Sequence, residues 1–95
     1  MIPKDELEKA TELARKYHIG KFYLVGSALS GDPEEANDYD FVVEDVPPGR
    51  FFSFYGELMA VMPKPVDVIL LTNDGSRFER LIHEEAQLIY EQAKT

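Results

Sequence analysis

The sequence of 95 residues contains no cysteine. This absence excludes disulfide bonds, thiolate catalysis and cysteine-based zinc sites, so oxygen ligands are the main metal chemistry left to the chain. Long apolar runs are lacking too, because no segment approaches the roughly 20 apolar residues that a membrane span needs. The first residues lead into a polar segment rather than a signal peptide. Together these absences predict a cytoplasmic protein without membrane contact.

Basic residues are also scarce. Lysine and arginine number 10 against 18 acidic residues, and the formal net charge is −8. Such a charge repels phosphate backbones, and no basic stripe is present, so direct nucleic-acid binding is not expected. The hydrophobic fraction of 44%, with six Phe and five Tyr, is still sufficient for a core. The length predicts one domain over residues 1–95.

Three segments carry apolar residues at helical spacing. The first covers Lys4–Tyr17, and the second covers Arg50–Met62 and is ended by Pro63. The third begins after Ser76, which together with Glu79 matches a capping box. The sequence therefore predicts three amphipathic helices that pack on a sheet.

Four shorter segments are rich in aromatic and β-branched residues and are bounded by turn residues. These expected strands are Lys21–Val25, Tyr39–Glu44, Val66–Leu71 and a short final strand at Leu88–Tyr90. Residues 28–37 are expected to form a loop. The pattern predicts an α+β fold in which a small mixed β-sheet is backed by helices on one face. The functional site is expected at the exposed edge of that sheet.

Three aspartates are the candidate catalytic and metal-binding residues. Asp38 and Asp40 are two residues apart on a strand, so they share a face, about 7 Å apart along the chain. Asp67 interrupts an otherwise apolar strand, and crowding a third carboxylate against the pair is costly unless a cation neutralises it. Carboxylates suit Mg²⁺, with Mn²⁺ as a substitute. His18 and His83 have no ligand-spaced partner and are expected at the surface.

Gly26 and Ser27 directly follow the first expected strand. A glycine allows the backbone to approach a ligand closely, and the next turn presents N–H groups and a hydroxyl to phosphate oxygens. An isolated Gly-Ser pair is more often a plain strand-to-helix turn with Ser27 as the N-cap. The aspartates downstream favour a triphosphate-binding site instead, opposite a metal that supports in-line nucleotidyl transfer.

In this order and spacing the sequence resembles the DNA polymerase β-like nucleotidyltransferase superfamily. Its signature is Gly-Ser, a short gap, Asp-x-Asp and a later Asp on a neighbouring strand. Here Gly26-Ser27, ten intervening residues, Asp38-Tyr39-Asp40 and Asp67 match that signature. Over nearly its whole length the chain looks like the minimal nucleotidyltransferases, which include the MntA-type antitoxins. The resemblance implies a polymerase β-like palm fold, Mg²⁺ as cofactor and ATP or another nucleoside triphosphate as substrate.

One departure from the family concerns the basic residue that many minimal members carry shortly after Gly-Ser. The corresponding segment here, Ala28–Gly31, has no basic residue. A positive charge for the triphosphate would therefore have to come from elsewhere, and the candidates are Lys21, Arg50, Lys64 and Arg77.

The resemblance implies transfer of a nucleoside monophosphate, AMP from ATP, to an acceptor hydroxyl. Minimal nucleotidyltransferases often act as antitoxins beside a helical HEPN-type ribonuclease, so a toxin of this type is the expected partner and acceptor. Two alternatives stay open. The chain could be a catalytically impaired module that neutralises a partner by contact, or one subunit of an enzyme that modifies a small molecule such as an aminoglycoside. Self-association into a homo-oligomer is also open.

Overall fold

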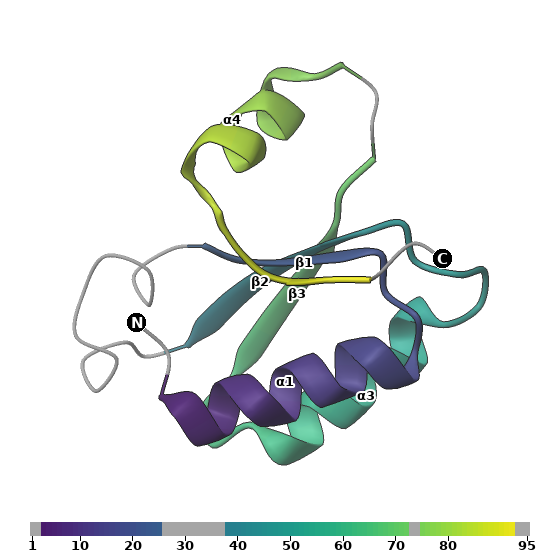
Figure 1. Cartoon of the computed structure of the whole chain (residues 1–95), viewed down its shortest axis with the longest axis vertical. Helices are drawn as coiled ribbons and strands as arrows, with labels where there is room; N and C mark the ends of the chain where they lie inside the picture. The colour runs from purple at the N-terminus through teal and green to yellow at the C-terminus, as the bar shows by residue number, and fades with distance from the viewer. Residues whose placement is uncertain (1–2, 26–37, 73–74, 93–95) are drawn as a thin grey trace.

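The computed structural model describes residues 3–25, 38–72 and 75–92. All the expected helices and strands are present in this part of the chain, and their ends lie within one residue of the bounds where a bound was predicted. The expected loop over residues 28–37 lies outside the described residues. In chain order they are α1 Lys4–Lys16, β1 Lys21–Val25, β2 Tyr39–Glu44, α3 Phe51–Val61, β3 Val66–Leu70, α4 Arg77–Glu85 and β4 Gln87–Glu91. Figure 1 shows the sheet between two layers, with α1 and α3 below it and α4 above it.

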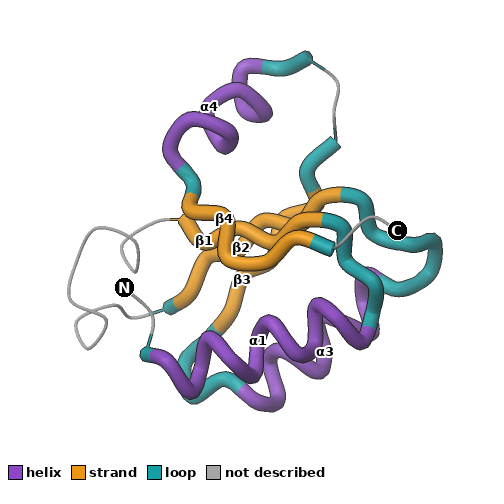
Figure 2. The backbone as a smooth tube through the Cα atoms, viewed as in Figure 1, coloured by secondary structure: helices purple, strands orange, loops and turns teal. Residues whose placement is uncertain are grey.

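The four strands form one mixed sheet, as the sequence predicted, and their order is β3-β2-β1-β4. β1 runs antiparallel to both β2 and β4, whereas β2 and β3 are parallel. β3 is therefore an edge strand, and this explains why Ile69 and Leu70 stay 46% and 45% exposed although the strand is apolar. The tube view in Figure 2 shows the same path of the strands between the helices.

The main core lies between the sheet and the pair α1 and α3. Side chains alternate along β2, so Tyr39, Phe41 and Val43 all point to this side and are fully buried. Phe22 of β1 packs against Phe41 and, in an edge-to-face contact, against Phe54 of α3, with ring centroids 4.9 and 5.5 Å apart. This aromatic packing fixes α3 under β2 and β3, the two strands that carry the candidate aspartates.

The opposite face of the sheet is covered in part by α4, which corrects the expectation that the helices lie on one face. Val42, the β2 residue between Phe41 and Val43, joins Tyr23, Leu71 and the α4 residue Ile82 in a second buried cluster. Helical spacing identifies an apolar side but does not tell which face of a sheet that side covers. A buried apolar residue on each side of β2 requires cover on both.

The connection from α1 to β1 sets the position of β1 along β2. The Gly20 N–H donates to the carbonyl oxygen of Asp45 at 3.0 Å. A Cβ atom at position 20 would lie 2.4 Å from the Cβ of Asp45, so only glycine allows this approach. The contact holds the first residue of β1, Lys21, opposite the last residue of β2, Glu44.

The start of α4 confirms the predicted cap. The Ser76 hydroxyl oxygen accepts a hydrogen bond from the backbone N–H of Glu79 at 3.2 Å, which satisfies one of the free donors of the first turn. Among the residues that the structure describes, no helix is both long and apolar enough to cross a lipid bilayer.

Candidate functional site

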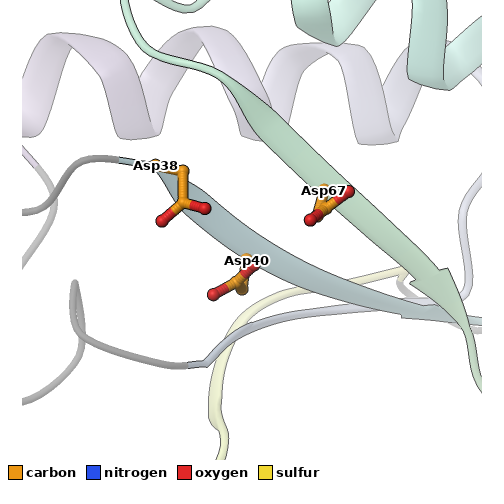
Figure 3. A group of neighbouring side chains, drawn as sticks. All are labelled: Asp38, Asp40 and Asp67. Carbon is orange, nitrogen blue, oxygen red and sulfur yellow. The ribbon is translucent and has the colours of Figure 1, made fainter.

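The parallel pairing of β2 and β3 brings the three candidate aspartates together. Asp40 is the second residue of β2 and Asp67 the second residue of β3, and the register places them opposite each other. Asp38 lies just before β2, on the same face as Asp40. One carboxylate oxygen from each of the three lies within 4.8 Å of the others. Figure 3 shows the three carboxylates along two neighbouring strands.

The three carboxylates place strong negative charge in a small volume. Burial raises the pKa of Asp40, and the charges of Asp38 and Asp67 raise it further. Asp40 is half-buried, whereas Asp67 is exposed. A nearby cation would offset the repulsion of Asp40 by the charges of Asp38 and Asp67.

The donor set fits a hard divalent cation. Octahedral Mg²⁺ binds oxygen at about 2.1 Å, so two ligands on opposite sides of the ion lie about 4.2 Å apart. The observed limit of 4.8 Å between oxygens of Asp38, Asp40 and Asp67 is close to that span, and small side-chain rotations are enough to close it. All three donors are oxygens, and neither a sulfur nor an imidazole is among them. Their role as ligands stays a prediction that this geometry supports.

Replacing Asp40 by asparagine is expected to stabilise the metal-free fold at neutral pH. Folding raises the pKa of Asp40 above its ordinary value of 3.8. The protonated side chain therefore contributes to the stability of the fold below pH 3.8, and this contribution is lost as the pH rises through the pKa of the folded state. Asparagine stays neutral at all pH values. Asp40→Asn should therefore melt at a higher temperature than wild type at pH 7, and this advantage should vanish below pH 3.8.

In saturating Mg²⁺ the order of the two melting temperatures should reverse, with wild type melting above Asp40→Asn. An ion that binds only the folded protein stabilises it by about 2.7 kcal/mol at a hundred times its Kd. Wild type should gain this stability in saturating Mg²⁺ and Asp40→Asn should not. Thermal unfolding at about pH 7 and about pH 3.5, on either side of the Asp40 titration, with and without Mg²⁺, gives all the required values. If the melting temperature of wild type is the same with and without Mg²⁺ or Mn²⁺, this result would argue against the metal site.

The predicted triphosphate-binding residues Gly26 and Ser27 lie outside the described residues. Val25, the described residue before them, is paired with Asp40 across β1 and β2. The end of β1 is therefore beside the carboxylates, which is the position needed for a site that combines Gly26-Ser27 with the aspartates. The contribution of Gly26 and Ser27 to phosphate binding stays a prediction.

The structure separates the four basic residues named as sources of positive charge. Lys21 lies at the other end of β1 from Val25 and is 3.8 Å from a carboxylate oxygen of Glu91. Arg50 occupies the N-cap position of α3 without a capping hydrogen bond from its side chain, and Arg77 is the first residue of α4. Lys64 lies just before β3, and its Nζ is 5.6 Å from the ring centroid of Tyr39. Of these four, Lys64 is placed at the end of the sheet where β2 and β3 begin and the carboxylates lie.

Three side-chain contacts could not be predicted from the sequence. The Tyr55 hydroxyl of α3 lies 3.2 Å from Oδ1 of Asp67. On the α4 side, His83 is exposed, as predicted, yet its Nε2 lies 3.4 Å from Oε1 of the buried Glu44. The same carboxylate oxygen accepts from the Tyr23 hydroxyl at 3.2 Å, and burial followed by the Glu44 charge raises the pKa of Tyr23 to about 12. Tyr55 lies in a segment whose helical spacing indicates packing, which gives no sign of a contact with Asp67. Glu44 and His83 are 39 residues apart.

Comparison with known proteins identifies the family of the chain. Residues 8–95 match the family described as "Polymerase beta, Nucleotidyltransferase". Comparison with curated protein sequences gives no significant match.

Two similar solved structures are toxin–antitoxin complexes. One is a mutant of the toxin–antitoxin MntA-HpeT, with a TM-score of 0.71 and 14% identity over 90% of this chain and 73% of that one. The other is the toxin–antitoxin MntA-HepT, with a TM-score of 0.68 and 14% identity over 95% of this chain and 74% of that one. At this identity the likeness shows a shared fold. The family match covers nearly all of the sequence, and the chain therefore belongs to the polymerase beta nucleotidyltransferase family.

Proposed function

We propose that this protein is a metal-dependent nucleotidyltransferase that moves AMP from ATP to a hydroxyl group of a partner protein. The observation that carries the proposal is the convergence of Asp38, Asp40 and Asp67 within 4.8 Å on two neighbouring strands of a nucleotidyltransferase fold. In the reaction the acceptor oxygen bonds to the α-phosphorus, the bond from that phosphorus to the pyrophosphate oxygen breaks, and pyrophosphate leaves. Bound Mg²⁺ would neutralise the charge that develops on the phosphate oxygens.

The three aspartates take different parts in this proposal. Asp38 and Asp40 hold the metal together with the triphosphate, and Gly26-Ser27 bind the phosphates. Asp67 completes the metal site and accepts the proton of the attacking hydroxyl as general base. Because Asp67 is exposed and lies on the edge strand β3, an acceptor can approach it from solvent. The half-buried Asp40 is the less accessible partner of the pair.

The acceptor that fits this site best is a protein. The solved structures similar to this chain are toxin–antitoxin complexes, which supports a toxin as partner. The family resemblance of the sequence implies a helical toxin of the HEPN type, and we propose this type of partner. A net charge of −8 favours a partner with a basic face, as a ribonuclease needs for RNA. Such a partner would present a Tyr, Ser or Thr hydroxyl at the exposed edge of the sheet. Complex formation should weaken as salt concentration rises.

Intact-mass spectrometry tests the reaction directly. The protein encoded by the adjacent gene is incubated with this protein, ATP and Mg²⁺, and its mass is compared with that of a sample without ATP. We expect an increase by the mass of one or more AMP groups. No binding between the two proteins would remove the toxin–antitoxin setting.

Neutralisation of a partner by contact alone is the second candidate function. It is favoured by one feature, the absence of a basic residue in Ala28–Gly31, where many minimal nucleotidyltransferases carry one. Tight binding to the adjacent-gene protein with no added mass would support contact-only neutralisation. An AMP adduct on the partner would exclude it.

A further inference from the structure

Tyr55 links the core helix α3 to the candidate base on the sheet edge. Its hydroxyl lies 3.1 Å from the carbonyl oxygen of Val66 and 3.2 Å from Oδ1 of Asp67. Val66 and Val68 point into the core beside α3, so alternation directs Asp67 away from that core. A side chain from α3 can still reach its carboxylate because β3 is an edge strand with no neighbour on its outer side in the described sheet.

The hydroxyl has one proton and two acceptors. A carboxylate is a stronger acceptor than a backbone carbonyl, because hydrogen bonds to an ionised group are roughly twice as strong as those between neutral groups. Oδ1 of Asp67 is therefore the stronger acceptor of the Tyr55 proton. The carbonyl oxygen of Val66 is the second acceptor within reach of the same hydroxyl.

We infer that Tyr55 is the positioning residue of Asp67, an inference that rests on the proposed function. Asp67 is exposed, and its carboxylate would otherwise rotate about its side-chain bonds. The bond from Tyr55 holds Oδ1 in place and leaves Oδ2 for the metal or the acceptor proton. Tyr55 itself is anchored by its half-buried ring, which packs edge-to-face on Phe51 at 5.9 Å. The orientation of the exposed ligand is thus set by the core.

A double-mutant cycle on Mn²⁺ binding tests the inference without any transfer reaction. Mn²⁺ affinity is measured by electron paramagnetic resonance for wild type, Tyr55→Phe, Asp67→Ala and the double variant. Loss of an outer-shell hydrogen bond typically costs ten- to a hundredfold in metal affinity, so we expect Tyr55→Phe to bind Mn²⁺ about tenfold more weakly. In the Asp67→Ala background the second change should cost nothing, because there is no carboxylate to orient.

Tyr90→Phe is the matched control, since Tyr90 is a half-buried tyrosine on β4 at the opposite edge of the sheet. Its Mn²⁺ affinity should equal that of wild type. Melting temperatures of all variants separate positioning from folding, because a merely structural hydroxyl would lower stability equally in both backgrounds and leave metal affinity unchanged. That outcome, or an equal loss of Mn²⁺ affinity with and without Asp67, would overturn the positioning role. Wild-type protein that binds no Mn²⁺ would overturn the proposed function, and the inference with it.

Discussion

Asparagine in place of Asp38 or of Asp40 is expected to abolish metal-dependent nucleotide binding while the protein stays folded. Each change removes one negative charge and one strong oxygen ligand from a site whose oxygens lie within 4.8 Å. Changes outside the first ligands of a metal already cost ten- to a hundredfold in affinity, so removal of a ligand should cost at least about a hundredfold. The triphosphate is held partly through that metal, and its affinity should fall in parallel.

Isothermal titration with a non-hydrolysable ATP analogue, with and without Mg²⁺, measures this loss. Asp45→Asn is the matched control, because Asp45 is an exposed aspartate beyond the other end of β2 and its positive φ of 57° suits asparagine. The control should keep wild-type affinity. If both Asp38→Asn and Asp40→Asn bind the analogue as tightly as wild type, the site lies elsewhere.

The strands and helices were predictable because their signals are local. The segment Tyr39–Glu44 is rich in aromatic and β-branched residues, which is enough to define β2. Ser76 with Glu79 marks the start of α4 by a pattern that the hydrogen bond confirms. The face of the sheet that α4 covers was not predictable. It depends on the packing of Val42, Leu71 and Ile82, which come from three separate segments. Helical spacing does not indicate which strand residues a helix packs against.

The convergence of the three aspartates was predictable from the sequence, and their surroundings only partly. Asp67 could be identified in the sequence because a charged residue inside an apolar strand is costly without a compensating partner. The parallel pairing of β2 and β3 places it opposite Asp40. The contact of Tyr55 with Asp67 depends on β3 being an edge strand, which is a property of strand order rather than of either residue. The position of Lys64 beside Tyr39 likewise required the fold.

Asparagine in place of Asp67 is expected to have the opposite profile, with nucleotide binding retained and AMP transfer lost. Asp67→Asn should weaken metal binding to the free protein, but in the nucleotide complex the phosphate oxygens add ligands to those of Asp38 and Asp40 and hold the metal. The side-chain amide introduced by Asp67→Asn keeps a carbonyl oxygen that can accept from Tyr55. The change removes the group that takes the proton of the attacking hydroxyl. General-base catalysis contributes about 10²- to 10⁴-fold, so transfer should slow by that factor.

The measurement pairs two observations on the same Asp67→Asn sample. Titration with the ATP analogue and Mg²⁺ should give an affinity close to wild type, and intact-mass spectrometry of the adjacent-gene protein should show AMP addition slowed or absent. Because binding is kept while turnover falls, the lost interaction belongs to the transition state rather than to ground-state binding. Loss of nucleotide affinity in Asp67→Asn would instead mean that the nucleotide complex needs the Asp67 ligand as much as those of Asp38 and Asp40, and the division of roles would be wrong. The exposed edge of β3 would then hold the triphosphate, and the acceptor would have to enter from the side of Asp38.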